Sequence, residues 1–434
     1  MAAIVDDAIS GRRGDTFREG AGGAPARLFF APRRAGTADR VIAVVLAVAT
    51  GTRFEIAYSA SLSLALTALT AVLWLPTVIR SRRYLILAAI VAAAALSGAL
   101  LTGFSSGLTS TADALSRTLV LLALPLGVAA LMWCVAVTSV TTMTIAFGAG
   151  MMLSIVTLFA ENGANWRFTF SVPVTILVLA LVSASRRVWP QPAALVVLAL
   201  IGVVNDSRSN SSMLLLAAAL IVGQWVSRQH SVRARVLSAA ATLLVAGVAT
   251  YFLIQSAILE GYFGEVTQAR TEAQLASSGS LILGGRPEIA ASTALIARHP
   301  LGMGSGVSAT YDDILAAKQG MWSIGYNPDN GYVNGYLFGG SVEVHSMFGD
   351  YWLWFGIAGV VLLAFLVWTV LSGFVQDFAG RSLTALFAYL TIRFLWDASF
   401  SPAVPAHLLP LTVVLAFVAA QYSARLRLAW SPAP

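Results

Sequence analysis

Residues 116–136 read SRTLVLLALPLGVAALMWCVA, and this stretch decides the fold class. Its single charged side chain is that of Arg117, next to its start. A helix needs about 20 consecutive apolar residues to cross the hydrocarbon core of a bilayer. Residues 116–136 therefore predict a transmembrane helix.

Comparable apolar stretches follow one another along most of the chain, and at about 20 residues per span they predict an all-α polytopic membrane protein with about 12 transmembrane helices. The weakest is the first, because Arg53 and Glu55 interrupt it. The predicted spans cover residues 41–58, 60–79, 84–103, 116–136, 140–160, 168–184, 189–205, 211–227, 235–256, 346–372, 380–396 and 404–424.

The composition agrees with this class. Of the 434 residues, 58% are hydrophobic and only 11% are charged, against about 25% charged in a soluble domain. The net charge of +7 comes mostly from arginines in short loops beside apolar stretches, which is typical of topology determinants and argues against a nucleic-acid partner. The single cysteine, Cys134, excludes an intrachain disulfide and a cysteine-based metal site.

The basic residues also predict the orientation. With the N-terminus in the cytoplasm, 18 of the 27 basic residues fall in cytoplasmic segments, as the positive-inside rule requires. Both termini are then cytoplasmic, and the loop 257–345 is extracytoplasmic. The chain divides into a largely disordered tail (1–40), nine spans (41–256), the loop module (257–345), three spans (346–424) and a second tail (425–434). Short helices are expected in the loop at 265–277 and from Pro287 to about Ala297.

His345 lies where this loop meets a span, so that its imidazole is wet on one side and apolar on the other. That position suits a general base acting on a lipid-linked substrate, although an interfacial histidine can also be a simple anchor. Asp350 follows five residues later and is a candidate to orient the imidazole, but the helical spacing does not assure a contact.

Two arginines are candidates to bind an anion. Arg208 occupies a short extracytoplasmic loop, where positive charge is disfavoured, and its alternative role is an ion pair with Asp206. Arg286 precedes the expected helix at Pro287, and a guanidinium beside a helix N-terminus can grip phosphate oxygens; alternatively it is a solvated loop charge. Arg298 and His299 end the same helix, where we expect them to cap its carbonyl groups.

Several motifs are absent. The chain has no Cys/His cluster, no His-Glu-x-x-His, no Walker lysine and no Gly-x-Ser-x-Gly, so we expect no cofactor, no bound metal and no ATP. Four tryptophans near the spans are typical of an aromatic belt, although they can also stack on sugar rings: Trp322, Trp352, Trp354 and Trp396. Arg393 and Asp397 are four residues apart and can pair with each other.

An ordered set of short motifs resembles the O-antigen ligase superfamily, which includes O-antigen polymerases. That family has a histidine, then Asn, Ser or Gln, nine residues, a glycine, two residues, and Gly, Thr or Tyr. The matching positions are His345, Ser346, Gly356 and Gly359, preceded by Ser207-Arg208, by Arg286 and by His299-Pro300-Leu301-Gly302-Met303-Gly304. The resemblance runs from about residue 41 to the C-terminus, and its specific motifs lie between about 190 and 360.

The resemblance implies a metal-independent inverting glycosyltransferase of the bacterial inner membrane. Its donor would be a glycan on polyprenyl (undecaprenyl) diphosphate, and its acceptor a hydroxyl of a glycan or glycolipid. His345 would be the general base on the extracytoplasmic side, and Arg208 and Arg286 would bind the diphosphate. Ligase and polymerase remain open.

Three other classes were weighed. A transporter or flippase of lipid-linked saccharides would use intramembrane charges such as Arg117, Arg393 and Asp397, but the chain shows no internal repeat. A glycosyltransferase with a metal-bound acidic pair in its first outer loop would need more than Glu55 there. A cell-wall polymerase of the shape, elongation and division type relies on an aspartate, whereas the best motif here is built on histidine.

Overall fold

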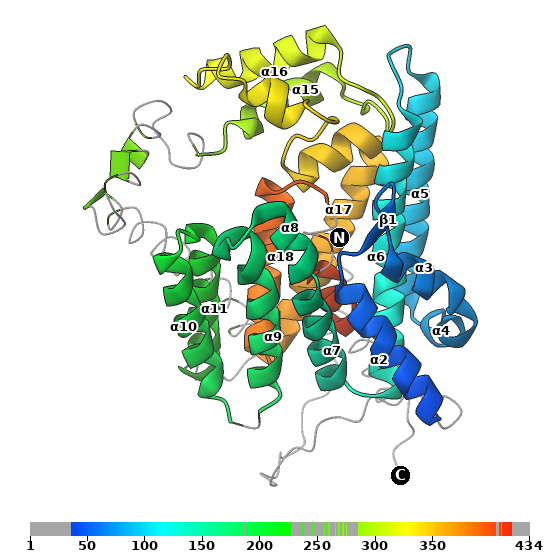
Figure 1. Ribbon diagram of the computed structural model, residues 1–434, viewed down its shortest axis with the longest axis vertical. Helices are drawn as coiled ribbons and strands as arrows, with labels where there is room; N and C mark the ends of the chain where they lie inside the picture. Colours follow the sequence, from blue (N-terminus) through cyan, green and yellow to red (C-terminus); the bar gives the residue numbers. More distant parts are fainter. Residues whose placement is uncertain are drawn as a thin grey trace.

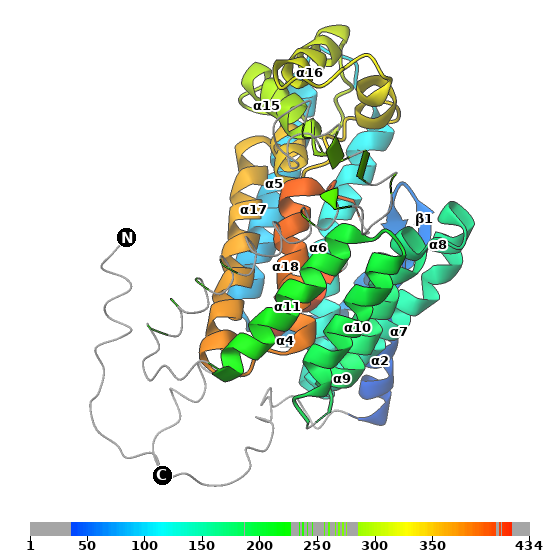
Figure 2. The same ribbon diagram turned by 90° about the vertical axis from the view of Figure 1, so that its left-hand side faces the viewer.

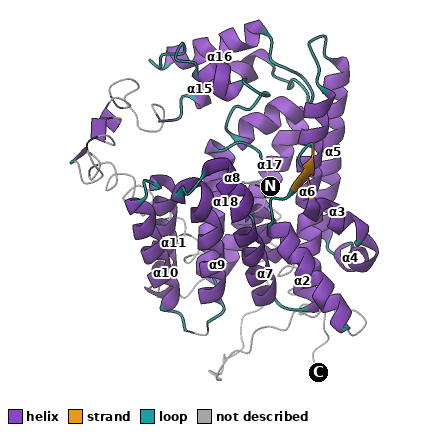
Figure 3. Ribbon diagram, viewed as in Figure 1, coloured by secondary structure: helices purple, strands orange, loops and turns teal. Residues whose placement is uncertain are grey.

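The computed structural model describes residues 36–185, 187–226, 285–404 and 410–418, together with single residues between 234 and 275 and at 408. Most of these residues are helical, and Figure 3 shows one small pair of strands among the helices. Five of the described helical segments are long and apolar enough to cross a membrane: Arg82–Phe104, Thr111–Val137, Val140–Asn162, Trp166–Ser183 and Met347–Ala379. They confirm an all-α membrane protein, while the total of about 12 spans stays a prediction.

The first predicted span ends early. Helix α2 (Thr37–Gly51) stops at Gly51, and the chain then forms an antiparallel hairpin of β1 (Glu55–Ala57) and β2 (Ala60–Ser61). The expectation of a helix over 41–58 was therefore wrong in its second half. Helix α2 begins at Thr37, inside the predicted tail 1–40, of which residues 1–35 lie outside the described part.

The second predicted span is not one helix. Residues 60–79 form α3 (Leu62–Leu69) and α4 (Ala71–Val78), which are separated at Thr70. The Thr70 hydroxyl donates to the carbonyl of Leu66, which competes with the helix for that acceptor. Pro76 inside α4 has no backbone N–H to donate, so the local sequence further weakens a continuous helix.

The other described helices of the bundle follow the predicted spans more closely. They are α5 (Arg82–Phe104), α6 (Thr111–Val137), α7 (Val140–Leu153), α8 (Ile155–Asn162), η1 (Trp166–Phe170), α9 (Ser171–Ser183), α10 (Pro190–Val204), α11 (Arg208–Val226), α17 (Met347–Ala379) and α18 (Ala385–Phe400). Helix α17 packs against α5 and α18, and α18 packs against α11, as Figures 1 and 2 show. The predicted span 235–256 and helix 265–277 fall largely outside the described residues, and of 404–424 the structure describes helical residues at 408 and 410–418.

Helix α17 is kinked at Gly356, whose φ of 60° is left-handed. A Cβ there would collide with the carbonyl oxygen of Leu301, because the segment after α15 crosses the helix at this point. The backbone N–H groups of Met303 and Gly304 donate to the carbonyl of Leu353, at 2.7 and 3.0 Å. Gly356 thus allows close packing, and its partner is this loop rather than another helix.

Residues 285–346 cover one end of α17, and we call this segment the cap. It contains α15 (Glu288–Arg298), α16 (Tyr311–Ser323) and the short η2 (Tyr332–Leu337). Figures 1 and 2 both show α16 at the end of the cap away from the bundle. Pro287 precedes α15 as its N-cap, so this helix lies where the proline predicted it. The cap ends at Ser346, the N-cap of α17.

Candidate functional site

His345 is the last residue of the cap before the N-cap of α17. Its φ of 55° is left-handed, a conformation that few non-glycine residues adopt and that often marks functional positions. The residue is 9% exposed, and Nδ1 lies 3.0 Å from the carbonyl oxygen of Glu343. Because a carbonyl can only accept, Nδ1 carries the proton and Nε2 carries the lone pair. The imidazole is therefore oriented with Nε2 available as a base.

The surroundings keep this imidazole neutral. Burial lowers the pKa of His345 below its ordinary value of 6.5, and it outweighs the hydrogen bond to Glu343 and the carboxylates of Glu288 and Glu343, which act in the opposite direction. The positive charge of Arg286 lowers the pKa further. A neutral imidazole at neutral pH is the form that can accept a proton.

Two tyrosines of η2 complete one side of the site. The ring of Tyr336 stacks on His345 with centroids 3.8 Å apart, and Tyr332 packs against Tyr336 at 4.7 Å. The Tyr332 hydroxyl donates to Glu288 Oε2 at 3.1 Å. Burial raises the pKa of both phenols, so both are protonated donors. Neither tyrosine was selected from the sequence, although Tyr-x-x-x-Tyr places both rings on one face of a helical turn.

Arg286 is linked to His345 through Glu288, Tyr332 and Tyr336. Its Nη1 donates to Glu288 Oε1 at 3.2 Å, and its guanidinium carbon lies 5.8 Å from the ring centroid of Trp396 on α18. Glu288 is 2% exposed whereas Arg286 is 28% exposed. Within the described residues, this one hydrogen bond engages one of the five N–H donors of the guanidinium. The buried carboxylate thus holds an arginine whose remaining donors can bind an anion.

Arg208 is the first residue of α11 and forms an ion pair with Asp206 at 3.3 Å. This ion pair is the alternative role that the sequence suggested for it. No described contact joins Arg208 directly to His345 or Arg286. On the same helix as Arg208, Asn210 accepts a hydrogen bond from the Tyr389 hydroxyl at 2.8 Å, and Arg393 contacts Tyr389 at 3.5 Å. The structure therefore links Arg286 to His345 through residues of the cap, and among the described residues no contact extends this link to Arg208.

Arg167 on η1 is a further basic residue of the site. Its charge acts on the Tyr336 phenol, in the same direction as that of Arg286. Arg167 was not a candidate from the sequence, because it lies at the start of an ordinary apolar stretch. Its electrostatic effect on Tyr336 is what makes it a candidate.

Asp350 does not contact the imidazole, so its expected role in orienting His345 directly was wrong. Its carboxylate is fully buried and accepts the backbone N–H of Val344 at 2.8 Å and that of Ala403 at 2.9 Å. Asp350 thereby fixes the backbone immediately before His345 and ties it to the segment that follows α18. It is a positioning residue for the histidine.

Arg298 and His299 do not cap α15 with their side chains, which corrects the expectation for them. Arg298 Nε lies 2.9 Å and His299 Nε2 2.7 Å from Asp313 Oδ1 at the start of α16. Although burial raises the pKa of Asp313, the hydrogen bonds from His299 and Thr310 hold it below its ordinary value. These residues join the two helices of the cap, which gives them a structural role.

Arg117 and Trp354 hold the cap to the bundle. Arg117 donates to the carbonyls of Ser305 at 2.8 Å and Val342 at 3.3 Å, and its guanidinium carbon lies 4.7 Å from the Trp354 ring centroid. Trp354 also donates to Val342 at 2.8 Å and is 4% exposed, so it does not belong to an aromatic belt. The buried charge of Arg117 is thus accounted for by the attachment of the cap.

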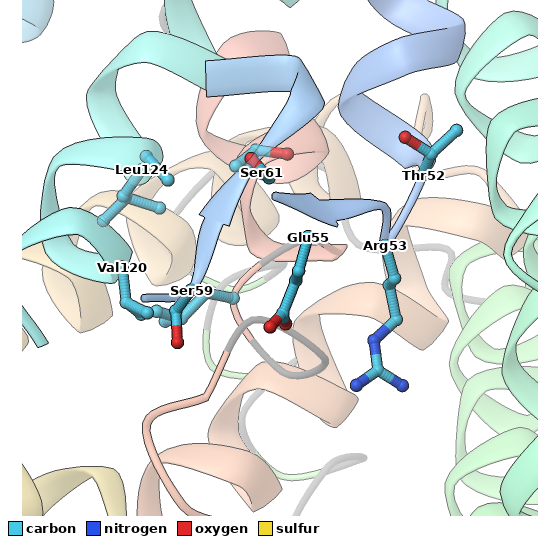
Figure 4. A pocket seen from close by; sticks show the side chains of 10 residues that line it. Thr52, Arg53, Glu55, Ser59, Ser61, Val120 and Leu124 are labelled. Atoms are coloured by element: carbon cyan, nitrogen blue, oxygen red, sulfur yellow. The ribbon is translucent and has the colours of Figure 1, made fainter. Parts of the chain in front are cut away.

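A separate pocket lies where the hairpin of β1 and β2 meets α6. Figure 4 shows the side chains of Arg53 and Glu55 pointing to the same side of this pocket. Among the described residues that line it, Glu55 is the only acidic one. In the described part of the chain, no group of three or more His, Cys, Asp or Glu side chains is arranged to hold a metal ion.

Comparison with known proteins adds no assignment to this geometry: no family model matches the chain, and no curated protein matches it. The fold and the site together define an all-α membrane protein with a neutral, oriented histidine beside an arginine at one end of a helix bundle.

Proposed function

We propose that this protein is a metal-independent, inverting glycosyltransferase of the O-antigen ligase or polymerase type. It moves a glycan from polyprenyl diphosphate to an acceptor hydroxyl on the extracytoplasmic face of a bacterial inner membrane. The observation that carries the proposal is His345, with Nδ1 bound to the Glu343 carbonyl and Nε2 available, beside Arg286. A base and a cation in one place are what transfer from a diphosphate carrier requires.

The reaction is a single displacement. His345 Nε2 takes the proton from the acceptor hydroxyl, and the hydroxyl oxygen forms a bond to the anomeric carbon. The bond between that carbon and the diphosphate oxygen breaks, and polyprenyl diphosphate leaves with the electron pair. Arg286 and Arg208 bind the diphosphate and stabilise its growing negative charge. Attack opposite to the leaving group inverts the anomeric centre.

The pH dependence follows from the lowered pKa of His345. A lowered pKa means that the imidazole remains neutral to a lower pH than an ordinary histidine. We expect kcat/KM for transfer to fall on the acid side with a midpoint below about 6.5, the ordinary value. Initial rates between pH 4.5 and 8 test this, and a midpoint above 6.5 would contradict the assigned role.

Asp350→Asn tests the positioning role. An amide oxygen can accept only one of the two N–H groups that the carboxylate accepts, and the amide nitrogen then faces the other donor. We expect a loss of about 1–3 kcal/mol of unfolding free energy and a fall in kcat with an unchanged KM for the donor. Asp312→Asn, at an exposed carboxylate in the cap, is the control that should change neither quantity. An Asp350→Asn protein with wild-type kcat would show that Asp350 does not position His345 for the reaction.

The proposed activity is tested with purified protein, a chelator, no nucleotide and a polyprenyl-diphosphate oligosaccharide. Products are released by mild acid and sized. We expect transfer that survives chelation, with a ladder of lengths for a polymerase or a single addition for a ligase. Tight donor binding without transfer, over a range of acceptors, would contradict the proposal and favour a flippase.

A further inference from the structure

A groove lies on the cap, beside the end of α16. Its volume is about 500 Å³, within the range of ligand sites. It is lined by Leu315, Lys318, Gln319, Trp322, Gly325, Tyr326, Asn327, Pro328 and Asp329. Because α16 lies at the end of the cap away from the bundle in Figures 1 and 2, the membrane belt expected for Trp322 does not fit its place. The aromatic side chains here need another explanation.

The groove combines an apolar platform with neutral polar groups. Trp322 is 73% exposed, which is unusual for so large an apolar side chain. Lys318 and Asp329 form an ion pair at 2.8 Å, so that the charged residues of the lining cancel. Amides from Gln319 and Asn327 add both donors and acceptors. This lining suits a ligand with an apolar face and many hydroxyl groups, and it offers no net charge for a phosphate.

The loop that forms one wall is braced in place. Asn327 Oδ1 accepts the backbone N–H of Asp329 at 3.0 Å, and Asn330 Nδ2 donates to the Tyr326 hydroxyl at 2.9 Å. A wall that is already ordered loses little entropy when a ligand binds.

A series of aromatic rings leads from this groove to the candidate base. Tyr326 lines the groove and packs edge-on against Tyr332 with centroids 6.0 Å apart. Tyr332 packs against Tyr336 at 4.7 Å, and Tyr336 stacks on His345 at 3.8 Å. Three successive contacts therefore connect the groove with the site of the proposed reaction.

We propose that the groove beside α16 binds an uncharged part of a saccharide chain, several sugar units away from the reacting end. A pyranose ring stacks its C–H face on Trp322. The amides of Gln319 and Asn327 donate to and accept from its hydroxyls, and the Asp329 carboxylate accepts from them. The identity of the ligand as a glycan rests on the proposed function. The protein then holds its substrate at this groove as well as at the reacting end, so longer glycans bind better than short ones.

The test measures binding separately from transfer. The probes are oligosaccharides released by mild acid from the lipid-linked glycans of the source organism and fractionated by length, and the protein is the full chain in detergent. By calorimetry we expect Trp322→Ala to weaken binding of the longer fractions by about 3- to 10-fold, the loss for one aromatic stacking contact. Trp189→Ala is the matched control, since Trp189 is also exposed, at 64%, but lies at the start of α10.

Each outcome bears on the inference. Two results would overturn the proposed glycan site in the groove. One is wild-type protein that binds no fraction, and the other is a Trp322→Ala protein whose affinity for the longer fractions is within 1.5-fold of wild type. Weaker binding in Trp322→Ala with normal binding in His345→Ala supports it, whether or not transfer occurs. Conversely, transfer that persists in His345→Ala defeats the proposed catalytic site and leaves the binding result intact. The two proposals therefore fail in different experiments.

Discussion

Replacing His345 by alanine should lower the rate of glycan transfer by about 10²- to 10⁴-fold, the usual contribution of a general base. The reason is that Nε2 is the nitrogen left to accept a proton once Nδ1 is bound to the Glu343 carbonyl at 3.0 Å. The donor is bound by other residues, so its dissociation constant should change by less than about threefold, a difference below 1 kcal/mol. Initial rates and donor binding on the same preparation measure both quantities.

His299→Ala is the matched control for this experiment. His299 is the other described histidine of the cap, and it binds Asp313 at the junction of α15 and α16. Its loss should lower the unfolding temperature but spare the rate of the folded protein. A His345→Ala protein that is correctly inserted and as active as wild type would remove the histidine from the reaction.

Arg286→Ala should lower kcat/KM for the lipid-linked donor by about 10²- to 10³-fold, the range for losing one group that stabilises a developing negative charge. Arg286→Lys should restore only part of the activity, because an ammonium group cannot bind phosphate oxygens in bidentate fashion. Transfer kinetics at varied donor concentration give both values.

Structural damage must be separated from the loss of donor binding here. Removing Arg286 leaves the carboxylate of Glu288, which is 2% exposed, without its ion pair. The double variant Arg286→Ala/Glu288→Gln removes that uncompensated charge and should recover much of the lost stability while staying inactive. A double variant with wild-type kcat/KM would show that Arg286 serves only to neutralise Glu288.

The class of fold could be predicted because apolar length is a local property. The long apolar stretches predicted α5 to within two residues at either end and α6 and α17 to within about five and seven, and Pro287 predicted the start of α15. The hairpin after Gly51, the break at Thr70 and the kink at Gly356 could not be predicted in the same way. Each depends on a competing contact, such as the loop that donates to the Leu353 carbonyl.

The residues of the candidate site also fall into those that could be selected from the sequence and those that could not. His345 and Arg286 were selectable because each occupies a boundary between a loop and a helix. Glu288, Tyr332 and Tyr336 were missed, since their contacts with these residues arise only when η2 folds against α15. Asp350 was selected for the wrong contact, because its partners are backbone N–H groups that sequence spacing does not reveal.

The most direct test of the central claim is a cryo-electron microscopy structure of the protein with a phosphonate analogue of the polyprenyl-diphosphate donor, which cannot release its glycan. We expect the diphosphate to lie within hydrogen-bonding distance of Arg286. The anomeric carbon should lie near His345 Nε2, with room for an acceptor hydroxyl between that carbon and Nε2. A diphosphate bound instead beside Arg53 and Glu55, in the pocket of Figure 4, would contradict this expectation.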